Sequence, residues 1–102
     1  LGSNATANVK NSAGNVFSVL CQNLNAAIRY LQLHNTATTP SASAVPAISI
    51  PVPASSTTVV GTDFFNSSGI NFSNGIAFAF STTSGTYTAG TAADQMTQIT
   101  YK

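Results

Sequence analysis

Apolar residues along this chain recur at every second position in short runs, and clusters of Gly, Pro, Asn, Ser and Thr separate the runs. A period of two is that of a β-strand, because successive side chains of a strand point to opposite faces. In the clearest run, Ile76, Phe78 and Phe80 share one face. Ala77 and Ala79 share the other face, which is small enough for another backbone or subunit to approach closely. The pattern predicts an all-β protein.

Further strands are expected wherever the alternation returns. At residues 15–22 and 27–34 the apolar runs are nearly continuous, which predicts cover on both faces. Proline cannot donate to a sheet, so Pro51 places the strand at residues 48–52 on an edge. The remaining strands are expected at residues 57–60, 76–81 and 95–101, with a weak one around Tyr87. Seven to eight short strands predict a single antiparallel β-sandwich of the jelly-roll or Ig-like kind.

The 102 residues leave room for one domain. We expect the sandwich to span residues 9–102, with residues 1–8 forming an N-terminal arm or being foreign to the native protein. Residues 35–44 are polar and poor in large side chains, so they predict an exposed loop. The core of so short a chain is small beside the entropy lost on folding. We therefore expect a homo-oligomer, in which copies bury more surface.

Five residues carry a formal charge, and none is a glutamate. Acid–base catalysis and metal binding both draw on such groups, so we expect no enzyme, no cofactor and no metal site. A net charge of +1 without a basic cluster predicts no nucleic-acid partner. The apolar runs are far shorter than the roughly 20 residues of a membrane-spanning helix, which predicts no membrane segment. The charged residues are Lys10, Arg29, Asp63, Asp94 and Lys102.

Three side chains offer candidate chemistry. Arg29 lies within an apolar strand, and an unpaired buried charge is costly, so it should either reach solvent or be paired. We expect an ion pair with Asp63 or Asp94, within the subunit or across an interface. His34 is the only imidazole, and a zinc site would need ligands that the chain does not supply. Cys21 lies in an apolar run and is expected to be a buried, inert thiol.

Three stretches resemble small β-sandwich proteins encoded among bacteriophage virion genes. They read RYLQLHNTATTP at residues 29–40, NFSNGIAFAFSTT at residues 71–83 and YTAG at residues 87–90. The resemblance covers most of the chain after Asn8, and its motifs are structural, so no catalytic residue is carried over. Proteins of this kind are similar to head decoration or cement proteins, which often sit as trimers on the capsid. The resemblance thus implies a virion location and favours a trimer.

The resulting expectation is a non-enzymatic virion structural protein that bridges and stabilises capsid subunits, with capsid or other virion proteins as partners. The alternative is a carbohydrate-binding or adhesin module of a tail, collar or fibre. That module would need exposed aromatic side chains, and core or interface packing is the preferred interpretation of Tyr30, Tyr87 and Tyr101. The candidate interface residues are Thr36, Thr38, Pro40, Ala77 and Ala79.

Overall fold

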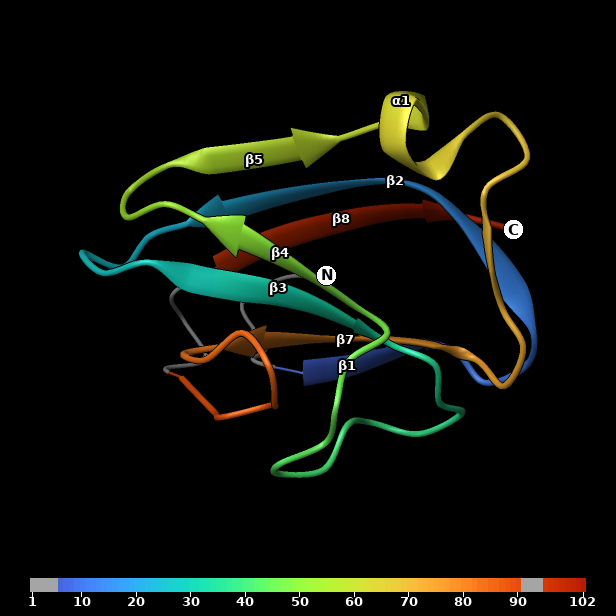
Figure 1. The fold of residues 1–102 in the computed structure, drawn as a ribbon, viewed down its shortest axis with the longest axis horizontal. Helices are drawn as coiled ribbons and strands as arrows, with labels where there is room; N and C mark the ends of the chain where they lie inside the picture. Colours follow the sequence, from blue (N-terminus) through green and yellow to red (C-terminus); the bar gives the residue numbers. More distant parts are fainter. Residues whose placement is uncertain (1–5, 91–94) are drawn as a thin grey trace.

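A computed structural model gives the fold, and it describes residues 6–90 and 95–102, apart from the side chain of Thr62 (Figure 1). Within these residues, eight strands form two antiparallel sheets that face each other. This arrangement confirms the predicted all-β sandwich. In sheet A the strand order is β1 (Thr6–Lys10), β7 (Ile76–Ser81), β3 (Arg29–His34) and β4 (Ile48–Val52).

Sheet B is built around one long central strand, β2. One side of β2 pairs with β8, and the other side pairs with both β5 and β6, since Val19 faces partners in β5 and β8 at once. The strands of sheet B are β2 (Gly14–Asn23), β5 (Thr57–Val60), β6 (Ile70–Phe72) and β8 (Gln95–Tyr101). The predicted bounds of β5, β7 and β8 agree with the structure, and Pro51 lies in edge strand β4 as expected.

The core lies between the sheets and consists of the inward-facing half of each alternating run. Burial of these side chains stabilises the fold by roughly 1.5–3 kcal/mol for each large residue. The fully buried apolar side chains of the core are Val16, Leu31, Leu33, Val52, Phe65, Phe72, Ile76, Phe78 and Phe80.

Two strands and one helical turn differ from the sequence expectation. Strand β1 begins at Thr6, so residues 6–8 belong to the sandwich and not to an arm. Its only apolar side chains are Ala7 and Val9, which is too weak a pattern to detect. Strand β6 spans three residues and is equally short of signal. The segment after β5, in a chain expected to be all-β, forms a short helix, α1 (Thr62–Phe65).

The two sheets differ in how their outer faces are covered. Cover on both faces was expected for β2 and β3, and only β3 has it. Phe17 and Leu20 on the outer side of β2 are half-buried, because no segment of the described chain is laid over sheet B there. On β3, Gln32 and His34 are both buried on the outer side.

Two loops form a layer over the outer face of sheet A, and they are seen at the bottom of Figure 1. One connects β3 to β4 (residues 35–47) and the other follows β7 (residues 82–90). The loops are joined by backbone hydrogen bonds from the Ser43 N–H to the Tyr87 carbonyl (2.9 Å) and from the Tyr87 N–H to the Ala44 carbonyl (2.8 Å). We call them the loop layer.

The helical content is small. Among the described residues, no helix has the length and hydropathy that crossing a membrane requires.

Candidate functional site

Gln32 and His34 form a polar pair beneath the loop layer. The Nε2 atom of Gln32 donates to the backbone carbonyls of Thr83 (2.9 Å), Ser84 (3.2 Å) and Thr86 (3.0 Å). Three acceptors at one end of the amide require that end to be the NH2 group, so Oε1 faces the other way. This oxygen lies 3.0 Å from Nε2 of His34. Because Oε1 can only accept, Nε2 of His34 must carry the hydrogen.

The imidazole of His34 is neutral in this setting. Its side chain is 3% exposed, and burial lowers its pKa below the usual 6.5. The ring of Tyr87 meets it edge to face, with 6.5 Å between the ring centroids. With the hydrogen on Nε2, the second nitrogen, Nδ1, is an acceptor. Within the described residues Nδ1 has no hydrogen-bond partner, and it is not among the fully buried unpartnered atoms, so it reaches open space.

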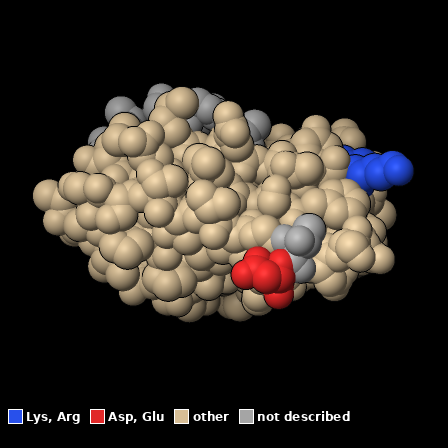
Figure 2. Space-filling model, turned by 90° about the horizontal axis from the view of Figure 1, so that it is seen from above, with Lys and Arg blue, Asp and Glu red and all other residues tan. Residues whose placement is uncertain are grey.

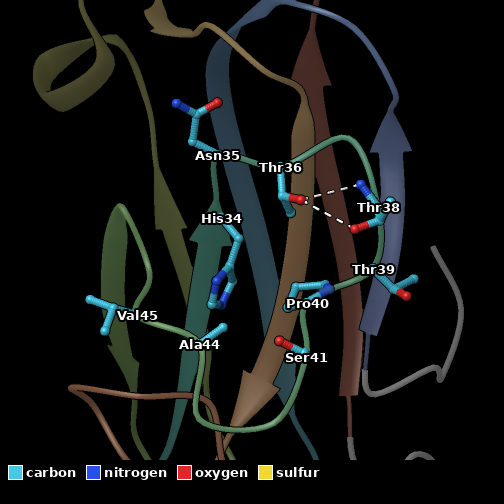
Figure 3. A pocket seen from close by; sticks show the side chains of 9 residues that line it. All are labelled: His34, Asn35, Thr36, Thr38, Thr39, Pro40, Ser41, Ala44 and Val45. Carbon is cyan, nitrogen blue, oxygen red and sulfur yellow. Dashed lines mark hydrogen bonds between the residues drawn. The ribbon is translucent and has the colours of Figure 1, made fainter.

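That open space is a pocket of about 200 Å³ between His34 and the loop that follows it. Figure 3 shows the imidazole beside Pro40, Ser41 and Ala44. No lining residue is charged. The side-chain oxygen of Thr36 accepts from the backbone N–H of Thr38 (3.3 Å), which turns the loop at the pocket rim. The residues that line the pocket are His34, Asn35, Thr36, Thr38, Thr39, Pro40, Ser41, Ala44 and Val45.

Three of the five candidate interface residues come together here. Thr36, Thr38 and Pro40 all line the pocket, although they were selected as parts of an exposed loop. Thr38 is exposed and Thr36 is half-buried, whereas Pro40 is buried. The loop is therefore partly packed, and its side chains are divided between solvent and the outer face of sheet A.

The other two candidates, Ala77 and Ala79, are not available as an interface. Both are fully buried, and they lie opposite His34 and Gln32 respectively in the β3–β7 register. Their small side chains do allow close approach, but the approaching backbone is the chain's own loop layer (Figure 1). The sequence pattern correctly predicted a close approach to Ala77 and Ala79. The interface assignment is wrong, because the chain's own loops make this approach.

The structure addresses one part of the expected Arg29 ion pair, the contact with Asp63 within the chain. Among the described residues Arg29 has no ion pair with Asp63, which is exposed in helix α1. The guanidinium donates from Nη1 to the carbonyl of Ile28 (3.0 Å), and its buried Nε has no hydrogen-bond partner in the described part of the chain. Asp94 lies outside the described residues, so its pairing with Arg29 stays a prediction.

Other candidate chemistry is dispersed. Cys21 is 1% exposed, which confirms the expected burial, and that burial raises the pKa of its thiol. Over residues 6–90 and 95–102 no cluster of His, Cys, Asp and Glu offers the three ligands of a metal site. The tyrosines do not form one platform, since Tyr87 is buried in the loop layer, Tyr30 is half-buried on sheet A and Tyr101 is exposed on sheet B.

The outer face of sheet B is a surface that the sequence analysis did not single out. Leu20 of β2 lies between Val59 of β5 and Gln98 of β8, and Gln22 lies between Thr57 and Met96. Val59 is 66% exposed and Met96 is 48% exposed. Figure 2, which views this side of the molecule, shows blue atoms at the right-hand end and red atoms at the lower margin, with tan side chains over most of the view. The sequence signal that could have identified this face is the alternation of positions in residues 57–60 and 95–101, every second one of which is exposed.

No known protein family, curated protein or solved structure matches the chain. The fold and its surfaces define the protein as an all-β sandwich. The outward side chains of the described strands of sheet B are uncharged, and the outer face of sheet A is closed by loops.

Proposed function

We propose that the protein is a non-enzymatic structural protein of a bacteriophage virion, where it decorates the capsid and bridges neighbouring capsid subunits. The observation that supports this role is the uncharged outer face of sheet B, which carries exposed Val59 and Met96 among amide and hydroxyl side chains. The resemblance of residues 29–40, 71–83 and 87–90 to small virion β-sandwich proteins supports the same setting.

Such a face suits permanent contact with another protein. Docking it desolvates no ionised group, so the large cost of burying charge does not arise. Each square ångström of apolar surface removed from water contributes about 25 cal/mol, and amide and hydroxyl groups form hydrogen bonds with the partner. A stable interface of this kind buries at least about 1,000 Å² in total. We further propose that the protein is a homo-oligomer, with a trimer favoured.

Imaging of an intact particle that carries this chain tests the location directly. We expect the chain on the outer surface of the head, with sheet B turned toward the capsid or toward another copy. Density for the chain in a tail, collar or fibre would contradict the capsid role. It would favour the alternative, a carbohydrate-binding or adhesin module, which the uncharged pocket beside His34 supports.

A matched pair of variants tests the docking face. Val59→Asp places a carboxylate on the exposed side of edge strand β5 in this face, and we expect at least about a tenfold loss of affinity for capsids prepared without the protein, because the charge is desolvated without a partner. Ala42→Asp places the same charge on the exposed loop over sheet A and is expected to bind normally. Co-sedimentation with capsids measures both. Equal binding by the two variants would exclude sheet B as the docking face.

A further inference from the structure

The pocket beside His34 has the composition of a ligand site. Its wall combines hydroxyl groups with the apolar surfaces of Pro40 and Ala44, and no lining residue is charged. Its volume of about 200 Å³ is smaller than the roughly 300–1,000 Å³ of drug-sized pockets, and equals the liquid volume of about six or seven water molecules. A ligand of that size is a single small ring or a single residue of a polymer.

One buried polar side chain, His34, lines this pocket. The Gln32 amide is fixed by three backbone carbonyls, and it in turn fixes Nε2 of His34 as the hydrogen donor. The Nδ1 atom is then a preorganised acceptor on a side chain that is 3% exposed. A preorganised acceptor of this kind favours the binding of a ligand that donates a hydrogen bond, because the imidazole loses no further freedom on binding.

We propose that this pocket binds one neutral, hydroxyl-bearing ring of monosaccharide size, which donates a hydrogen bond from a hydroxyl group to Nδ1 of His34. Hydroxyl ligands suit the remaining wall, because the hydroxyls of Thr39 and Ser41 can each donate and accept, whereas the Thr36 hydroxyl already contacts Thr38. The carbon-bound hydrogens of such a ring pack against Pro40 and Ala44. The site is independent of the docking face on sheet B, and its existence does not depend on the virion role.

Because His34 is the only histidine, its imidazole nitrogens give unambiguous nitrogen-15 NMR signals. The protein is titrated with the methyl glycosides of glucose, galactose, mannose and N-acetylglucosamine, up to about 100 mM to capture weak, millimolar binding. Tetrahydropyran, a ring of the same size without hydroxyl groups, is the matched probe. We expect at least one glycoside to shift the Nδ1 signal saturably, and tetrahydropyran to leave it unchanged.

The substitution Ala44→Leu fills the pocket, leaves the residues Gln32 and His34 in place, and is expected to abolish the shift. Ala47→Leu is the matched control on an exposed position that does not line the pocket, and it is expected to bind like the parent chain. The proposal is overturned if no glycoside shifts Nδ1, if tetrahydropyran binds as well as the glycosides, or if Ala44→Leu binds normally. Circular dichroism verifies that both variants fold.

Discussion

At the scale of single residues, Gln32 ties the loop layer to sheet A. Replacing Gln32 by Leu keeps the volume but removes the partner of three backbone carbonyls and of the imidazole. Unsatisfied buried polar groups cost about 1–3 kcal/mol each, so we expect a total loss of roughly 2–4 kcal/mol in the free energy of unfolding. Urea denaturation measures it.

Gln98→Leu, on the exposed outer side of β8, is the control and is expected to change stability by no more than about 0.5 kcal/mol. If the two leucine variants unfold at the same urea concentration, Gln32 does not hold the loop layer.

His34 makes stability depend on pH in a definite direction. Burial lowers its pKa in the folded state below the unfolded value near 6.5, so the unfolded chain binds the proton first as the pH falls. Stability is therefore complete above about pH 6.5 and declines as the pH drops toward the folded-state pKa. The titratable side chain that faces the imidazole is Tyr87, which stays neutral throughout this range.

Denaturation midpoints between pH 7 and 5 test this, with His34→Gln as the comparison because it keeps an amide donor for Gln32. We expect the variant to show a flatter pH dependence. An identical decline in both proteins would assign the effect to other groups.

At the scale of elements, the connection between β6 and β7 is fitted closely to the loop layer. A methyl group added at Gly75 would lie 2.5 Å from the carbonyl oxygen of Thr36 and 2.7 Å from that of Lys10. Both are backbone atoms that cannot swing aside, so Gly75→Ala is expected to destabilise the protein by about 1–3 kcal/mol. Thermal or urea unfolding measures the loss.

Gly85 provides the control, since a methyl group added there meets nothing within 4 Å. We expect Gly85→Ala to be neutral or slightly stabilising. A neutral Gly75→Ala would show that the loop over residues 35–38 shifts freely and is not held by this contact.

The strands that could be predicted are those with long, regular alternation. The difference between apolar residues and their polar neighbours is large enough to predict the bounds of two strands. These are β5, which contains Val59 and Val60, and β7, which contains the run from Ile76 to Phe80. Strand β1 has only Ala7 and Val9 to mark it, and its place beside β7 is decided by tertiary pairing. Sequence periodicity therefore identified the strands with clear apolar runs and missed β1, which has only small or few apolar side chains, and β6, which spans three residues.

The candidate site was predictable only in part. Thr36, Thr38 and Pro40 were selected from a polar segment, and the structure places them around one pocket. The pairing of Gln32 with His34 was not predicted: cover was expected on both faces of their strand, but the pattern does not identify the segment that covers its polar side. This polar side faces protein because two loops distant in sequence meet across it, at Ser43 and Tyr87.

At the scale of the whole molecule, the scarcity of charge governs how contacts respond to salt. Sheet B presents Val59, Leu20, Gln98 and Met96 without an ionised partner among them. Contacts between neutral surfaces are not screened, even though the screening length falls from about 10 Å at 0.1 M to about 3 Å at 1 M. We expect self-association, measured by mass photometry, and capsid binding to change less than about tenfold over that range.

A steep loss of binding in 1 M salt would show that the charged residues, Lys10, Arg29, Asp63, Asp94 and Lys102, dominate the interface instead. Stable monomers with unimpaired capsid binding would remove the oligomer from the proposal and leave the docking face intact.

The way in which the loop layer is attached has a consequence for sequence change. The hydrogen bonds that attach it to sheet A run from the buried amide of Gln32 to backbone carbonyls of residues 83–86. The bonds that join its two loops connect backbone atoms of residues 43–44 and 87, and any amino acid provides such backbone atoms. The hydroxyls of Thr36 and Thr83 also bond within their loops, whereas an outward side chain without such a bond, such as that of Thr86, can be replaced while the sandwich stays unchanged. The tip at Gly85 is consequently a natural position for grafting a foreign peptide onto this scaffold.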